Sequence, residues 1–399
     1  MITALLAIIY IAFISLGLPD TILGSAWPSI YGNIGVEVSA QGILSMITAG
    51  GTIISSFLSG KLIRRYGTGT VTGVSVLLTA LALLGYSFSG NIYMLCIFAV
   101  PLGLGAGSVD VALNNFVANH YKARHMSWLH CFWGVGATLG PIIMSYYIGK
   151  NSGWRSGYRT IALLQLALVF VLFLSLPLWR KVERREEEKG GEGDTIEKSI
   201  SFKELMRIKG VKAVLTALFS YIALEASTGY WGASYLVLSK GLSEENAAQW
   251  ISLFYMGITI GRFLSGFLTM KLKSKELINL GLAIITVGLS ILILPVPTSL
   301  LPMGFLLIGT GCAPIYPSIL HETPVNFGKD VSQSLMGIQM GFSYVGATFM
   351  PPLCGLIIGR ISPKLYPYYL IFFLVAMIIM VTRLYKVTAK VSKVKAPIS

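Results

Sequence analysis

A few ionisable side chains stand inside long apolar stretches of this 399-residue sequence, where they could bind and release a proton. The carboxyl groups placed this way include Asp20, Asp110 and Glu225, and the basic groups include His130 and Arg262. Charges are costly in an apolar environment, which makes such groups functional candidates. We expect the three carboxyl groups to carry protons, and Glu225 could also bind the solute or form a structural pair. Arg262 is expected to have a gating or structural role, either pairing with an acid across the structure or extending to the inner surface.

A second chemistry is hydrogen bonding to a polar solute. Asn114 follows Asp110 by four residues, so the two side chains share one face of a helix. A carboxylate and an amide on one face can bind adjacent hydroxyl groups. The same pair could instead bind a neighbouring helix. His130 could contact a solute or share a proton, or it could serve as a packing residue.

Aromatic side chains supply flat surfaces for stacking. For each of them, packing or anchoring at the lipid interface is an equally good interpretation. Gln339 could add an amide group from the second half of the chain. The candidates for solute contact, besides those above, are Trp27, Trp133, Tyr230, Trp231, Tyr316 and Gln339.

Composition shows where these residues must lie. Hydrophobic residues make up 54% of the chain and charged residues 12%, and the mean hydropathy is +0.72. A soluble domain has about 25% charged residues. This excludes a soluble enzyme, a disordered chain and a nucleic-acid-binding module, in spite of a net charge of +14. We expect an all-α membrane protein.

The apolar runs predict twelve membrane-spanning helices, because about 20 apolar residues cross a bilayer. The longest polar stretch, residues 180–209, divides them into two sets of six. We therefore expect an N-terminal six-helix bundle at 1–179, a cytoplasmic linker at 180–209, a C-terminal bundle at 210–386 and a basic tail at 387–399. The predicted spans are 2–30, 40–60, 70–88, 92–118, 127–149, 160–179, 211–238, 247–270, 277–296, 299–321, 331–359 and 365–385.

Loop cations predict the orientation. With both termini in the cytoplasm, 24 of the 31 Lys and Arg residues fall in inner segments and six in outer segments. Cytoplasmic loops are enriched in Lys and Arg, so this orientation is favoured.

The two sets of six spans are related in sequence. Residues 51–62 (GTIISSFLSGKL) and 257–268 (GITIGRFLSGFL) agree at seven of twelve positions. Residues 135–141 (VGATLGP) and 345–351 (VGATFMP) agree at five of seven. Both pairs have nearly the same offset and lie in corresponding spans. A parallel repeat of this kind predicts two bundles related by pseudo-two-fold symmetry, with a solute site between them and alternating access by rocking.

With these features the chain resembles the major facilitator superfamily over essentially its whole length. The family's loop motif after the second span is found at residues 60–67 (GKLIRRYG). At the position where the family's motif usually has an acidic residue, this chain has Arg64, which is followed by Arg65. We assign both arginines to gating or structure.

Local motifs look like the fucose–glucose permease branch, whose members are sugar–proton symporters. They are GLPD at 17–20 with Trp27 and Pro28, GLGAG at 103–107 with DVALNNF at 110–116, and LHCF at 129–132. That branch carries an acid in each of the first and fourth helices, where Asp20 and Asp110 stand. It places a polar sugar contact near His130.

The resemblance implies a monomeric transporter in the cell membrane that imports a monosaccharide together with a proton. Its partners would be the sugar, the proton and the lipid bilayer. Three alternatives stay open: a proton-driven exporter of lipophilic or cationic compounds, an uncoupled sugar uniporter, and a non-transporting receptor or membrane enzyme. The sequence has no nucleotide-binding or hydrolase motif, so we expect no enzyme activity, cofactor or metal.

Overall fold

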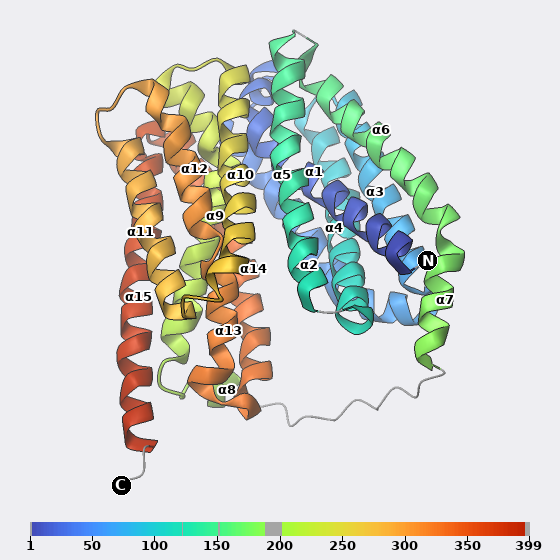
Figure 1. Cartoon of the computed structure of the whole chain (residues 1–399). Coiled ribbons are helices and arrows are strands. Elements are labelled where there is room, and N and C mark those ends of the chain that lie inside the picture. The colour runs from blue at the N-terminus through green and yellow to red at the C-terminus, as the bar shows by residue number, and fades with distance from the viewer. Residues whose placement is uncertain (1, 122, 151, 188–201, 396–399) are drawn as a thin grey trace.

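The structure is a computed structural model that describes residues 2–121, 123–150, 152–187 and 202–395. Its helices fall into an N-terminal bundle and a C-terminal bundle that stand side by side (Figure 1). The N-terminal bundle holds α1 (Ile2–Ile34), α2 (Gln41–Tyr66), α3 (Thr68–Phe88), α4 (Ile92–His120), α5 (Ala123–Gly149) and α6 (Gly153–Leu174). The C-terminal bundle holds α9 (Val211–Lys240), α10 (Glu244–Leu268), α11 (Ser274–Ile293), α12 (Leu301–Cys312), α13 (Ile315–Phe327), α14 (Lys329–Arg360) and α15 (Tyr366–Lys395).

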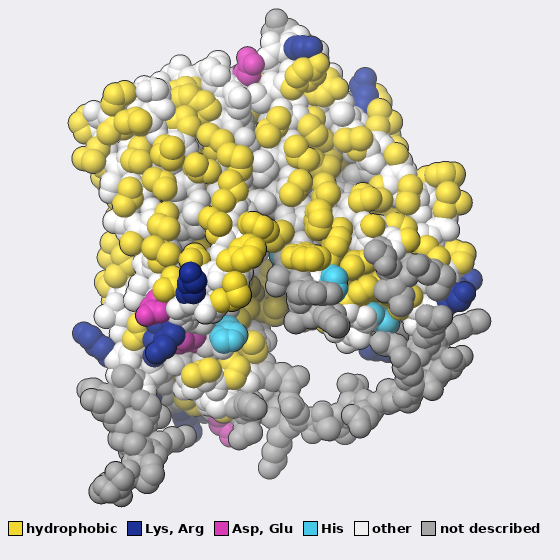
Figure 2. Space-filling view, in the orientation of Figure 1, with side chains coloured by type: hydrophobic (Ala, Val, Ile, Leu, Met, Phe, Trp, Pro, Cys, Tyr) yellow, Lys and Arg dark blue, Asp and Glu magenta, His cyan; other side chains and the backbone are white. Residues whose placement is uncertain are grey.

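The described residues contain twelve helical segments that are long and apolar enough to cross a membrane. This confirms the all-α fold with twelve predicted spans. Hydrophobic side chains cover the flanks of the molecule, and the charged side chains lie toward its two ends (Figure 2). Such a surface suits lipid around the flanks and water at the ends.

Small residues set the spacing of the helices within a bundle. In α1, a Cβ atom on Gly17 would lie 2.8 Å from the backbone nitrogen of Ala137 in α5 and would overlap the carbonyl of Trp133. Only glycine allows this approach, which is the usual device for close packing of membrane helices. The contact fixes the α1 segment that carries Asp20 against the α5 segment that carries Trp133.

The sixth span differs from its predicted position. We expected 160–179, whereas α6 begins at Gly153 and ends at Leu174. The predicted span left out the turn that contains Arg155, whose guanidinium donates to Asn33 Oδ1 at 2.5 Å and to the Ser89 carbonyl at 2.8 Å. An arginine bonded to the end of α1 and to the connection between α3 and α4 is tolerated at a helix end.

The chain between the bundles starts with helix α7 (Leu176–Glu187), which crosses the predicted boundary at 179/180. A short helix, α8 (Phe202–Leu205), lies in the predicted linker, and residues 188–201 are outside the described residues. We call the end of the bundles at which α7 and α8 lie the linker end, and the opposite end the far end.

The tenth predicted span consists of two helices. α12 ends at Cys312 and α13 begins at Ile315, with Ala313 and Pro314 between them. Proline has no backbone N–H and cannot continue the hydrogen-bond ladder, so the helix is interrupted at this point.

The two bundles close on each other at the far end. Gln41 Nε2 in α2 donates to the Tyr230 carbonyl in α9 at 3.0 Å, and Ser145 Oγ in α5 donates to the Glu245 carbonyl in α10 at 3.0 Å. Between them the molecule is hollowed toward the linker end (Figure 2). The conformation is therefore closed at the far end and open at the linker end.

Candidate functional site

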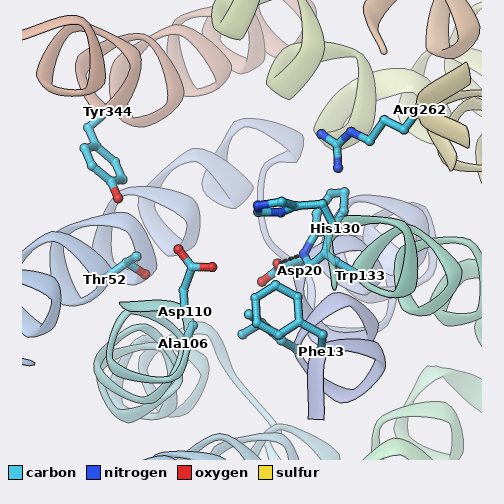
Figure 3. A pocket seen from close by; sticks show the side chains of 10 residues that line it. Phe13, Asp20, Thr52, Ala106, Asp110, His130, Trp133, Arg262 and Tyr344 are labelled. Carbon is cyan, nitrogen blue, oxygen red and sulfur yellow. Dashed lines mark hydrogen bonds between the residues drawn. The ribbon is translucent and has the colours of Figure 1, made fainter. Parts of the chain in front are cut away.

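A cavity of about 260 Å³ lies between the two bundles, inward of the far-end contacts. Two of the lining residues come from the C-terminal bundle, Arg262 in α10 and Tyr344 in α14, and the others from the N-terminal bundle. Figure 3 shows them around one open space. The lining residues are Phe13, Leu16, Asp20, Thr52, Ala106, Asp110, His130, Trp133, Arg262 and Tyr344.

Asp20 lies in the middle of α1 and reaches the cavity. Protein surrounds the residue, yet its side chain is exposed to the cavity space. Trp133 Nε1 in α5 donates a hydrogen bond to Asp20 Oδ2 at 2.8 Å. The carboxyl group is therefore held in a fixed position by α5 and is open to exchange with solvent or solute in the cavity.

Asp110 and Asn114 in α4 lie on one helix face, as their spacing predicted. Asn114 Nδ2 donates to Asp110 Oδ1 and to the Asp110 carbonyl oxygen, each at 2.9 Å. Asp110 lines the cavity beside Thr52 of α2 (Figure 3). The amide thus orients the carboxyl group and still has its own oxygen to accept a hydrogen bond.

Arg262 brings a positive charge from the C-terminal bundle. Its guanidinium carbon lies 5.2 Å from the centre of the Trp133 ring, within the range of a cation–π interaction across the two bundles. We expected a gating or structural role for Arg262, and the structure places it in the cavity wall.

His130 in α5 is exposed to the same cavity. Its ring lies edge-on to Phe13 of α1, with ring centres 5.9 Å apart. In Figure 3 the imidazole lies between Arg262 and Asp20. The structure therefore brings five of the predicted site residues together: Asp20, Asp110, His130, Trp133 and Arg262.

Glu225 lies deeper in the C-terminal bundle, in α9. The Tyr221 hydroxyl donates to its carboxyl group, and Arg262 interacts with it electrostatically. The Tyr221 ring lies 6.1 Å from that of Tyr316 in α13. Glu225 and Tyr316 thus belong to a polar cluster of the second bundle that borders Arg262 but does not line the cavity in this conformation.

Three further candidates are packed away from the cavity. Trp27 and Trp231 are fully buried, and their indole N–H groups donate to the carbonyls of Val38 at 2.7 Å and Pro351 at 2.6 Å. Gln339 is also buried, and its amide nitrogen donates to Thr323 Oγ1 at 3.0 Å. Here these side chains hold helices together.

The remaining candidates lie at the two ends. The Tyr230 carbonyl takes part in the far-end closure through Gln41. Arg64 and Arg65 are exposed near the linker end of α2, where the Arg65 guanidinium lies 5.3 Å from the centre of the Tyr66 ring.

Sequence reasoning did not select Thr52 or Tyr344, although both line the cavity. Thr52 is the second residue of the repeated segment 51–62, and Tyr344 immediately precedes the repeated segment 345–351. The repeats were therefore a signal that pointed to these positions. The described residues contain no group of three or more His, Cys, Asp or Glu side chains that could hold a metal ion.

Comparison with known proteins agrees with this architecture. The chain is 23% identical over 291 residues to the glucose/mannose transporter GlcP of Bacillus subtilis, which covers 70% of this chain and 71% of that protein. It is 25% identical over 289 residues to Bypass of stop codon protein 6 of Saccharomyces cerevisiae, covering 67% of this chain and 57% of that longer protein. It is 24% identical over 363 residues to the uncharacterized transporter y4wD of Sinorhizobium fredii, covering 85% and 87%.

Solved structures share the fold. A bacterial homologue of the human lysosomal transporter Spinster, in an inward-facing and unoccupied conformation, superposes with a TM-score of 0.74 at 13% identity and covers 100% of this chain and 99% of that one. A D-xylose–proton symporter superposes with a TM-score of 0.71 at 13% identity, covering 95% and 97%. The family model of the Major Facilitator Superfamily matches residues 9–331. The chain belongs to the Major Facilitator Superfamily and is a multi-pass membrane transporter of small molecules, not an enzyme.

Proposed function

We propose that this chain imports a monosaccharide, a hexose or deoxyhexose, together with a proton, by alternating access across the cell membrane. The observation that carries the proposal is the pair of carboxyl groups, Asp20 and Asp110, that reach one cavity between the bundles. Intramembrane carboxyl groups that line a cavity are the usual carriers of protons in transporters.

The cavity also favours a small polar solute. Its volume of about 260 Å³ lies below the range of roughly 300–1,000 Å³ that is common for drug-sized ligands. Asp110 and His130 in its lining offer hydrogen-bonding groups, Asn114 orients the Asp110 carboxyl group, and the Trp133 ring offers a face for the C–H groups of a sugar. Relatives named for sugars include GlcP and, at 22% identity over 268 residues, the hexuronate transporter of Bacillus subtilis.

In this mechanism Asp20 takes up a proton while the cavity is open at the far end, which the loop cations assign to the outside. Sugar then bridges the two bundles. The bundles rock to the conformation seen here, open at the linker end, and release both solutes to the cytoplasm. The loaded and empty carriers change conformation readily, whereas a half-loaded carrier does not. One chain contains the whole path, so the monomer is the proposed working unit.

The test is uptake by protein reconstituted in liposomes. We expect labelled glucose, mannose, galactose or fucose to accumulate above equilibrium only with an inward proton gradient. Asp20→Asn should abolish accumulation and leave exchange of internal for external sugar. The matched control is Glu244→Gln, a partly exposed acid in the first turn of α10 that does not line the cavity.

Each other outcome has a definite meaning. If sugar only equilibrates across the membrane, at a rate that does not depend on the proton gradient, the protein is a uniporter. Full accumulation by Asp20→Asn would remove Asp20 from the coupling step. If folded and inserted protein takes up none of these sugars, the proposal is wrong and a proton-driven exporter becomes the better hypothesis.

A further inference from the structure

Three side chains form a continuous connection from a coupling carboxyl group to the opposite bundle. Trp133 Nε1 donates to Asp20 Oδ2 at 2.8 Å, and both residues belong to the N-terminal bundle. The Arg262 guanidinium of the C-terminal bundle lies 5.2 Å from the centre of the same indole ring. Figure 3 shows the three side chains along one wall of the cavity.

This connection lies at the seam along which the bundles meet. Gly134, next to Trp133, packs against Thr259, which stands one helical turn before Arg262 in α10. Asp20 stands one turn before Gly24, which packs against the backbone of α9. A rocking motion that separates these contacts changes the distance between Arg262 and Trp133, whereas α1 and α5 stay together as parts of one bundle.

Titratable groups from several helices surround Asp20, and they differ in whether they stabilise its negative charge. Asp110 of α4, Tyr230 of α9 and Tyr255 of α10 interact with it electrostatically. A negative charge on Asp110 repels a negative charge on Asp20. His130 of α5 and Arg262 of α10 line the same cavity, and Glu225 of α9 interacts with Arg262.

A hydrogen bond donated to a carboxylate favours its ionised form. A cation over the face of an indole is attracted to the ring and polarises its N–H group as a donor. Both effects favour loss of the proton from Asp20 while Arg262 sits over Trp133. The conformation that has this contact is the one open at the linker end.

On this geometry, we infer that Trp133, held by Arg262 of the opposite bundle, is the positioning residue that makes Asp20 release its proton at the linker end. The inference rests on the proposed function. The proton leaves the Asp20 carboxyl group for water in the cavity, and the Trp133 N–H is not transferred. When the bundles rock, the distance between Arg262 and Trp133 changes, and with it the strength with which the indole N–H stabilises the ionised carboxyl group.

The test combines two variants with one control. Trp133→Phe keeps an aromatic ring and removes the donor N–H, and Arg262→Gln removes the charge. The control is Trp128→Phe, an exposed tryptophan on the same helix whose ring contacts His125 and not the cavity. Sugar counterflow is measured in liposomes from pH 5 to pH 9.

We expect Trp133→Phe to move the midpoint of the pH profile upward by about one pH unit. The free energy of a hydrogen bond to a charged group corresponds to a pKa shift of about this size. Arg262→Gln should move it in the same direction by less. Trp128→Phe should leave it unchanged. Because a purely structural or sugar-stacking role changes KM or kcat without moving the midpoint, an unmoved midpoint in Trp133→Phe would overturn the inference.

A second measurement does not depend on transport. Infrared difference titration follows the carboxyl C=O band that disappears in Asp20→Asn, in detergent-solubilised protein. Its midpoint should rise in Trp133→Phe and in Arg262→Gln. A rise in Trp133→Phe alone would remove Arg262 from the mechanism. If the midpoint of the band rises in both variants but sugar uptake does not depend on the proton gradient, the proposed function fails and the positioning role of Trp133 stands.

Discussion

The far-end closure depends on one close approach of two helices, and this gives a prediction that can be worked from the structure. A Cβ atom on Gly24 of α1 would lie 2.8 Å from Tyr230 Cα and 3.0 Å from the Tyr230 carbonyl oxygen, and would overlap the Gly229 carbonyl oxygen. These are backbone atoms of α9, so no side chain can move aside. Gly24→Ala therefore forces α1 and α9 apart.

The expected change in the conformational equilibrium follows from the free-energy cost of overpacking. Adding a methyl group to a close-packed contact costs about 1–3 kcal/mol. Here the cost falls on the conformation that is closed at the far end, because an opening at that end relieves the overlap. The population of the alternative conformation should rise by roughly five- to 150-fold.

The matched control is Gly32→Ala. Gly32 lies in the same helix, but a Cβ atom there would meet nothing within 4 Å. Spin labels on cysteines introduced at Glu37 and Lys240, both exposed near the far end, report the distance between the bundles. The background for this experiment has the four native cysteines replaced.

We expect the distance distribution of Gly24→Ala to gain a longer component and that of Gly32→Ala to match the wild type. Transport should slow because return to the form open at the linker end becomes unfavourable. If Gly24→Ala folds and shows the wild-type distances, the far-end closure does not depend on this contact, and the reasoning is refuted.

Three other predictions concern single side chains. Asn114→Ala leaves the Asp110 carboxyl group without its 2.9 Å amide donor and should raise the KM for sugar uptake by roughly tenfold; Asn115→Ala, at the exposed next position, should not change it. Trp231→Phe removes the indole donor to the buried Pro351 carbonyl and should destabilise the protein by about 1 kcal/mol in thermal unfolding, with an unchanged KM. Gly257→Ala should also lower the Tm, because its Cβ would lie 2.8 Å from the Thr310 backbone nitrogen, whereas Gly266→Ala, with nothing within 4 Å, should be neutral.

The helices were largely predictable because apolar length alone identifies a membrane span. The predicted spans differ from the structure at the start of the sixth span and at a break inside the tenth. The predicted sixth span began after Arg155, whose guanidinium is bonded to Asn33 and to the Ser89 carbonyl at the helix end. Pro314 divides the tenth span in two, and hydropathy does not register a missing N–H group.

The site was predictable to the extent that it rests on ionisable groups. Asp20 and Asp110 were selected because charge is rare in this chain, and both line the cavity. Residue type could not tell Trp133 from Trp27 or Trp231. All three are tryptophans in apolar helices, and only packing shows that Trp133 faces the cavity while the other two are buried with their N–H groups bonded to backbone carbonyls.

The internal repeat explains why the cavity is chemically asymmetric. Gly51 and Gly257 occupy equivalent positions of the repeated segment, and each packs against the backbone of a neighbouring helix, α4 for the first and α12 for the second. The shared residues of the repeat thus maintain helix spacing. Five residues further on the repeats differ, with Ser56 in α2 and Arg262 in α10. Ser56 donates to the Thr52 carbonyl at 2.8 Å and also bonds to Tyr344 of the C-terminal bundle, and Arg262 lies over Trp133 of the N-terminal bundle. The repeat thus keeps its packing glycines and differs at this position, where Arg262 lines the cavity and Ser56 does not. The C-terminal bundle in this way supplies a positive charge opposite Asp20 and Asp110 of the N-terminal bundle.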